Sequence, residues 1–166
     1  MGIDVRAECD RFLPFATNFV EWVQDAAEQE QPSASELLRL LADLQATALR
    51  LPADFTDVGL TEADSQRDPK VGRDLALRVC KKLPFNEYCA VFDPVEGDRE
   101  AIMINLDDDI GDIYNDLLEG ILLYEAGRYG DALWDWRFSY WTHWGRHLTR
   151  AHTAVYSRLA GSGEYY

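Results

Sequence analysis

The stretch from Asp107 to Tyr156 decides the fold: DDDIGDIYNDLLEGILLYEAGRYGDALWDWRFSYWTHWGRHLTRAHTAVY. It holds four of the five tryptophans and all three histidines of the chain. Apolar residues recur at helical spacing on both sides of Gly127-Arg128-Tyr129-Gly130, and glycines of this kind mark turns. We therefore expect two antiparallel helices, a helical hairpin over about residues 107–158.

The second helix of this hairpin carries an unusually wide apolar surface. At about 100° per residue, its apolar arc covers roughly 200°, whereas a surface helix needs a stripe of only about 100°. We therefore predict a helix that packs against neighbours on two sides. The arc holds Leu133, Trp134, Trp136, Phe138, Tyr140, Trp141, Trp144, Leu148, Ala151, Val155 and Tyr156.

Arg137 lies inside this apolar arc, among tryptophans. A guanidinium keeps its charge, so its burial requires a partner. Counting outward from the turn places Arg137 opposite Gly120, within one helical turn of Asp116 and Glu119. We predict a charge-assisted hydrogen bond from Arg137 to one of these acids, or to Asp112 if the register slips by one turn.

Two histidines of the second helix are candidate metal ligands. His143 and His147 stand four residues apart, and such a pair can present two imidazoles to one ion. The same count from the turn brings them near residues 109–114, where Asp109 and Asp112 could complete a site. However, the constant helical phase puts the two histidines at opposite edges of the apolar arc. We therefore predict no bound metal, and hydrogen bonds from each histidine to a carboxylate or a carbonyl.

Two groups of residues are thus candidates for function. A polar cluster, either ligand-binding or structural, comprises Asp112, Asp116, Glu119, Arg137, His143 and His147. Three aromatic residues do not all fit one buried strip and could leave a surface for a protein partner or for self-association: Trp134, Trp136 and Tyr140. The bland alternative is that these rings form a large aromatic core.

The rest of the chain predicts a mainly α bundle of about five helices in one domain, residues 1–166. Helices are expected over residues 4–29, from Ser33 to Pro52, and over residues 70–82, the second opened by a capping box of Ser33 and Glu36. Residues 87–92 and 101–104 predict a small β-hairpin. Residues 52–69 show no period and predict a loop, whose order the sequence leaves open.

Composition excludes several classes of partner. The chain has 16 basic and 30 acidic residues, a formal net charge of −14. Nucleic-acid binding depends on Lys and Arg against phosphates, and anionic membranes attract basic segments, so we expect neither partner. No segment reads as a transmembrane helix or a signal peptide. Cys9, Cys80 and Cys89 form no CxxC motif and read as reduced thiols of a cytoplasmic protein.

Several motifs of the C-terminal half resemble the bacterial domain-of-unknown-function family 5063. They are the VFDP of residues 91–94, the DIY of 112–114, Gly120, the YEAG of 124–127, the ALW of 132–134, the WRF of 136–138 and the HWGRH of 143–147. The resemblance implies no activity and no catalytic residue. More weakly, one tetratricopeptide unit is resembled by the spacing of Gly120, Gly127, Tyr129, Ala132, Trp136 and Ser139. Repeat arrays need at least three units.

These observations favour a non-enzymatic, cytoplasmic interaction or ligand-binding module that needs no cofactor. The alternative is a metal-dependent, hydrolase-like enzyme that uses the acids and histidines of the hairpin. The two hypotheses differ in one structural feature. An enzyme needs the acids to face the histidines at an accessible site, whereas the structural reading needs the acids bound to Arg137.

Overall fold

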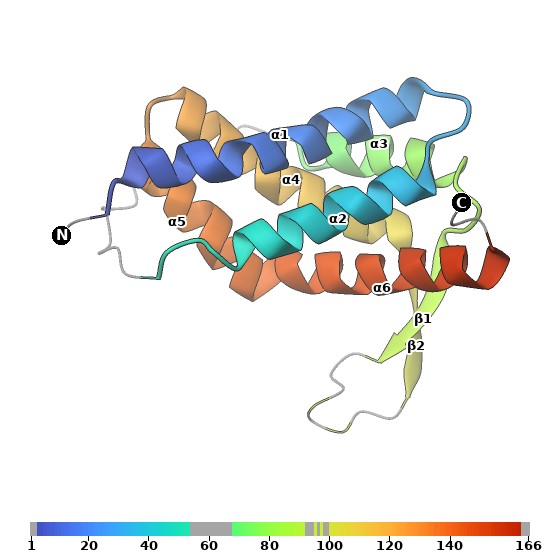
Figure 1. Cartoon of the computed structure of the whole chain (residues 1–166). Coiled ribbons are helices and arrows are strands. Elements are labelled where there is room, and N and C mark those ends of the chain that lie inside the picture. The colour runs from blue at the N-terminus through green and yellow to red at the C-terminus, as the bar shows by residue number, and fades with distance from the viewer. Residues whose placement is uncertain (1–2, 54–67, 92–94, 96, 98–99, 164–166) are drawn as a thin grey trace.

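A computed structural model describes residues 3–53, 68–91, 95, 97 and 100–163. The chain forms a helical bundle from which one β-hairpin projects (Figure 1). In chain order the elements are α1 (Val5–Glu28), α2 (Ala34–Ala48), α3 (Lys70–Cys80), β1 (Glu87–Val91), β2 (Ala101–Asn105), α4 (Leu106–Glu125), α5 (Tyr129–Ser139), the π-helical turn η1 (Tyr140–Trp144) and α6 (Gly145–Ser162). Because α5, η1 and α6 follow without a break, the predicted bundle of about five helices is confirmed.

The helices of the N-terminal half begin where the sequence predicts. The Asp4 carboxylate accepts a hydrogen bond from the Ala7 N–H at 3.1 Å, and the Ser33 hydroxyl accepts from the Glu36 N–H at 3.2 Å. These bonds satisfy N–H groups that have no partner within the helix. The Glu36 carboxylate accepts from the Trp22 indole at 3.2 Å, so it joins α2 to α1. The predicted loop of residues 52–69 lies mostly outside the described residues.

The predicted β-hairpin is present, and its base is fastened to the start of α4. β1 pairs with β2 in antiparallel register, from Glu87 opposite Asn105 to Val91 opposite Ala101. The Asn86 side chain accepts from the Asp107 N–H at 3.0 Å and donates to the Asp107 carboxylate at 2.5 Å. Since β2 continues directly into α4, these bonds hold the hairpin at a fixed angle to the bundle.

α4 is the central helix. It packs against α1, α3, α5 and α6. The continuous helix formed by α5, η1 and α6 contacts α4 on one side and α1 and α2 on another. Both Trp136 and Trp144 are fully buried, and Phe12 of α1 meets the Trp136 ring edge-on at 5.0 Å. The large aromatic core and the two-sided packing of the second hairpin helix are therefore both confirmed.

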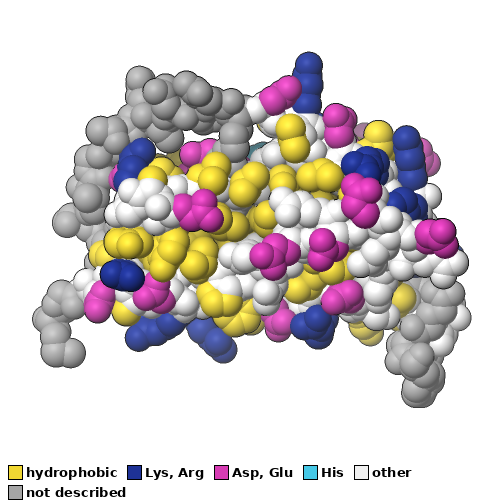
Figure 2. All heavy atoms as spheres, turned by 90° about the horizontal axis from the view of Figure 1, so that it is seen from above, with side chains coloured by type: hydrophobic (Ala, Val, Ile, Leu, Met, Phe, Trp, Pro, Cys, Tyr) yellow, Lys and Arg dark blue, Asp and Glu magenta, His cyan; other side chains and the backbone are white. Residues whose placement is uncertain are grey.

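The outer surface is acidic and mixed. Figure 2 shows one face of the bundle, on which carboxylates are spread among apolar and basic side chains. None of the described helices combines the length and the apolar character that a membrane span requires. Among the described residues, Asp109 is the one charged residue that is buried, with no exposed surface.

Candidate functional site: an aspartate and histidine network between α4 and α6

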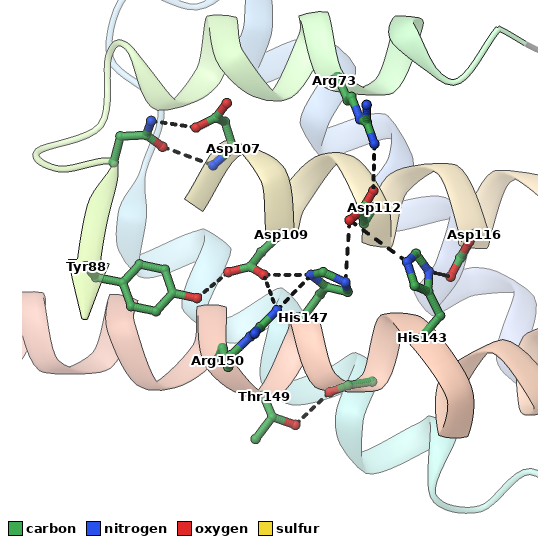
Figure 3. A network of polar contacts seen from close by, with 12 residues as sticks. Arg73, Tyr88, Asp107, Asp109, Asp112, Asp116, His143, His147, Thr149 and Arg150 are labelled. Carbon is green, nitrogen blue, oxygen red and sulfur yellow. Dashed lines mark hydrogen bonds and ion pairs between the residues drawn. The ribbon is translucent and has the colours of Figure 1, made fainter. Parts of the chain in front are cut away.

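Three carboxylates of α4 face η1 and α6 (Figure 3). They recur at intervals of three and four residues, which places them on one stripe of the helix: Asp109, Asp112 and Asp116. The opposite side supplies His143 from η1 and His147 from α6. His147 contacts Asp109 and Asp112, and His143 contacts Asp112 and Asp116, so the histidines lie at the level along α4 that the count from the turn predicts.

Asp109 is the buried anchor of the network. Its side chain is 1% exposed, and its Oδ1 lies 2.7 Å from Nδ1 of His147 and 3.3 Å from Nη2 of Arg150. The hydroxyl of Tyr88, from β1, donates to its other oxygen. Burial, and then the bond to Asp109, raise the pKa of Tyr88, so the phenol stays a neutral donor. The anion is thus compensated by one permanent cation and further donors.

The contacts of His147 indicate which of its ring nitrogens carries the proton. Nδ1 lies 2.7 Å from Asp109 and 3.2 Å from Nη2 of Arg150. A guanidinium only donates, so Nδ1 cannot donate to Asp109 and accept from Arg150 at once. The shorter contact to a buried carboxylate favours Nδ1–H donating to Asp109. In the neutral ring, Nε2 then holds a lone pair and faces Asp112 Oδ2 at 3.4 Å.

His143 repeats this arrangement one turn earlier. Its Nδ1 lies 2.6 Å from Asp116 Oδ2, and its Nε2 lies 4.0 Å from Asp112 Oδ2. The two imidazole rings are neighbours, with centroids 4.9 Å apart. Burial raises the pKa of Asp116, and the hydrogen bond with His143 opposes that shift. Arg73 of α3 approaches the other oxygen of Asp112 at 4.0 Å.

Three possible metal-ligand atoms therefore lie close to one another. Asp112, His143 and His147 each offer one atom, and these atoms lie within 4.8 Å of one another. In metal proteins the ring nitrogen that is not coordinated commonly donates to a carboxylate, which fixes the tautomer and the ring orientation. Asp116 and Asp109 hold the two rings in that manner. Two imidazoles and one carboxylate suit zinc or iron(II).

The expected separation of the two histidines is wrong. Residues four apart on a helix differ by only about 40° and are neighbours. In addition, the π-helical turn over Tyr140–Trp144 changes the phase of everything before it relative to everything after it. A single arc drawn at a constant angle from residue 133 to residue 157 therefore misplaces side chains. The two imidazoles are neighbours, so their position on the helix does not exclude a shared metal ion.

The predicted pairing of Arg137 with the acids of α4 is also wrong. Arg137 Nη1 donates to the carbonyl of Leu51 at 2.8 Å, and among the described residues no ion pair joins Arg137 to Asp112, Asp116 or Glu119. Trp136 faces Gly120 instead, so the helix is rotated by one residue from the predicted register. Glu119 is half-buried on α4. Of the predicted polar cluster, Asp112, Asp116, His143 and His147 come together.

The aromatic residues divide differently from the expectation. Trp136 is fully buried and Tyr140 is 7% exposed, so neither offers a surface to a partner. Trp134 is half-buried and stacks on Phe138 at 4.5 Å. The exposed rings of the predicted arc are instead Phe138, Trp141 and Tyr156, at 50%, 63% and 59%. These positions were assigned to the apolar arc. Trp141 lies within the π-helical turn, where a constant phase fails, whereas Phe138 precedes that turn in α5.

Sequence reasoning missed three members of the network: Tyr88, Arg150 and Arg73. Arg150 lies outside the apolar arc described above, and Tyr88 and Arg73 lie in predicted elements for which no contact with the hairpin was expected. The available signal was the aspartate series itself. Asp109 begins the run of acids at spacings of three and four residues, and a carboxylate at that position on the buried side requires donors from other elements.

The fold and this network define a mainly α protein in which a helical hairpin joins an aspartate stripe to a histidine pair. The chain belongs to the family described as Domain of unknown function (DUF5063), which matches residues 4–160. The match extends well beyond the C-terminal half on which the resemblance was first based.

Solved structures contain the same fold. One similar structure is that of protein BF1032 from Bacteroides fragilis, with a TM-score of 0.74 and 19% sequence identity over 90% of each chain. At this identity the likeness shows a shared fold. A search of curated proteins finds no match to the chain.

Proposed function

We propose that this protein binds a divalent first-row transition metal through Asp112, His143 and His147. One observation carries the proposal: three ligand atoms lie within 4.8 Å of one another. The site is the ligand-binding function of the module, and it revises the expectation that no metal is bound. No catalytic activity forms part of the proposal.

The hydrogen bonds around the site favour a positive charge between Asp112, His143 and His147. With both Nδ1 atoms facing Asp109 and Asp116, neutral rings direct two lone pairs toward a carboxylate oxygen. Groups that only accept repel one another at 3.4 Å and 4.0 Å unless a positive charge lies between them. That charge is either a proton on each imidazole or one metal ion. The metal satisfies all three acceptors at once.

The exposure of the site leaves room for a further ligand on the metal. The side chain of His143 is 48% exposed, while His147 is 17% exposed and Asp112 21%. Three protein ligands with one open position is the arrangement of metal sites that bind water or a small molecule. An exogenous ligand would enter from the His143 side.

Metal analysis with matched variants tests the proposal. The protein is purified without a polyhistidine tag, stripped with a chelator, and titrated separately with zinc, manganese and iron(II), the last under anaerobic conditions. We expect one equivalent of at least one ion by elemental analysis after gel filtration. His147→Ala should abolish this binding. His152→Ala is the control, because His152 lies on α6 outside the three-residue site.

Two outcomes would contradict a metal site. One is the absence of stoichiometric binding for all three ions at micromolar protein concentration. The other is binding that survives in His147→Ala and in His143→Ala, which would place the ion elsewhere in the chain. In either case the network is a structural set of imidazolium and carboxylate pairs.

A second function, contact with a protein partner or with another copy of the chain, is supported by the exposed rings. Phe138 and Trp141 are 50% and 63% exposed and lie beside Trp134. Exposed aromatic residues of this size are enriched in protein interfaces. We expect concentration-dependent association in sedimentation velocity, which Trp141→Ser weakens and Leu49→Ser, at another exposed apolar position, does not. A strictly monomeric wild-type protein would remove the self-association reading.

We also propose a reducing, cytoplasmic setting. Cys9, Cys80 and Cys89 are all free thiols, and free thiols are typical of that compartment.

A further inference from the structure

A groove of about 670 Å³ runs between β1 and α6. Phe85 and the whole of β1 line one side, and one face of α6 from Thr149 to Arg158 lines the other. The groove is separate from the ligand atoms of the proposed metal site, since Tyr88 and Arg150 reach the network from the Nδ1 side of His147. It is therefore a second place where a ligand could bind.

The groove lies along the edge of the sheet. Side chains of a strand alternate between its two faces, so a cavity on one face touches every second residue. All five residues from Glu87 to Val91 border this groove, which is the pattern of an edge. The described sheet has two strands, and β2 occupies the other side of β1. The edge toward α6 thus presents backbone N–H and C=O groups that a further strand can pair with.

The side of the groove formed by α6 carries small side chains, and two of their hydroxyls already have hydrogen-bond partners within the helix. Thr149, Thr153 and Ser157 recur every four residues along it. The hydroxyls of Thr149 and Thr153 donate to the carbonyls of Gly145 and Thr149, at 2.7 Å and 3.0 Å. Small side chains at this spacing leave width for a peptide backbone. A strand edge facing a helix in this manner is one arrangement by which proteins bind extended peptides.

The charge of the groove identifies the kind of peptide. Arg150 and Arg158 border it and Glu87 is the one acid there, in a chain whose net charge is −14. Nε of Arg150 is buried and has no hydrogen-bond partner among the described residues. The Arg150 charge is already paired with Asp109, so the exposed guanidinium of Arg158 is the group available to a carboxylate, which can accept two parallel N–H bonds from it.

We propose that this groove binds an extended, acidic peptide segment of a partner protein, which adds as a strand to the outer edge of β1. Backbone hydrogen bonds to β1 supply affinity, and a carboxylate of the peptide contacts Arg158. The proposal does not rest on a bound metal, because neither Arg158 nor β1 supplies a metal ligand.

Peptide display tests it without knowledge of the natural partner. A phage library of random heptapeptides is selected on the full chain and counter-selected on Ser157→Trp, in which an indole fills the α6 wall. Selected peptides are then synthesised and their affinities measured by fluorescence anisotropy. We expect sequences enriched in Asp and Glu that bind the wild-type chain and lose about tenfold in affinity for Arg158→Glu. Lys81→Glu makes the same charge change at an exposed position outside the groove and should bind as the wild type does.

Backbone methylation decides whether the peptide adds as a strand. Methyl groups on alternate amide nitrogens of a selected peptide should abolish binding in one of the two alternating patterns, because only one set of N–H groups faces β1. The proposal is overturned if no peptide is enriched on the wild-type chain. It is also overturned if selected peptides bind Ser157→Trp equally well, or if both methylated forms retain full affinity.

Discussion

The indole ring of Trp136 occupies the space in which any side chain at Gly120 would begin. The Trp136 Nε1–H donates to the carbonyl of Leu117 at 3.1 Å, one turn before the glycine. The edge of the ring that carries Nε1 therefore lies against the backbone of α4, and this contact sets both the distance between the two hairpin helices and their rotation.

Replacement of Gly120 by alanine should consequently be costly. The methyl group would overlap a fully buried ring that has no room to move, and overpacking of a core costs about 1–3 kcal/mol or somewhat more. We expect Gly120→Ala to lower the free energy of unfolding in urea by about 3 kcal/mol. Gly161→Ala is the control, because nothing lies within 4 Å of a β-carbon there and alanine favours a helix. Equal effects of the two variants would show that the helices are not in contact at Gly120.

Removal of the Asp109 carboxylate should destabilise the metal-free protein. Asp109→Ala leaves Arg150 without its anion and Tyr88 without its acceptor, and loss of one partner of a buried ion pair costs about 3–5 kcal/mol. Asp108→Ala, an exposed acid on the same turn, should change the free energy of unfolding by less than about 1 kcal/mol. Chemical denaturation in the presence of a chelator measures both. A small effect of Asp109→Ala would mean that water reaches the network.

Asp116 should act on metal affinity through His143. It holds Nδ1 of that ring and contributes no ligand atom to the three-residue site. Loss of such a supporting carboxylate weakens metal binding by about 10- to 100-fold. We expect this range for Asp116→Asn by competition with a chromogenic chelator, and unchanged affinity for Glu119→Gln on the same helix. Unchanged affinity in Asp116→Asn would show that His143 needs no orientation by this acid.

The three thiols should differ sharply in reactivity. Burial, and then the charge of Asp10, raise the pKa of Cys9 to about 12, and burial also raises the pKa of Cys80. Cys89 is exposed. At pH 8 we expect an aromatic disulfide reagent to modify one thiol rapidly and the other two only after denaturation. Cys89→Ser should remove the rapid phase, and rapid modification of a second thiol would contradict the burial of Cys9 or Cys80.

The same shift gives a direction for stability at high pH. The folded chain keeps the proton on Cys9 up to a pKa of about 12, whereas an unperturbed thiol loses it near 9.0. Between these values the folded state binds more protons than the unfolded state, so the free energy of unfolding falls as the pH rises from about 9 to about 12. Below that window these thiols contribute no pH dependence. Cys9→Ala should reduce the slope of stability against pH in this range.

The sequence by itself determined the secondary structure. Helical periodicity, the Ser33 cap and the glycines of the turn sufficed for the helices, and alternation with turn residues sufficed for the β-hairpin. The spacing of Asp109, Asp112 and Asp116 places them on one side of α4, but a constant helical phase put His143 and His147 at opposite edges of the arc, whereas their rings are neighbours. An equal rise per residue on two antiparallel helices brought them to the same level. These properties depend on residues close together in the chain.

Tertiary structure decided the rotation of each helix and the partners of each charge. A one-residue difference in rotation placed Trp136 rather than Arg137 against Gly120, because a large ring against a glycine fills the core and the guanidinium reaches the Leu51 carbonyl instead. At Gly145 a side chain would overlap the Tyr140 carbonyl, so the glycine permits the π-helical turn that alters the helical phase. The groove beside β1 and the bond from Tyr88 to Asp109 join segments distant in sequence. Periodicity fixes how residues of one helix are spaced, whereas packing against other elements fixes which way that helix faces.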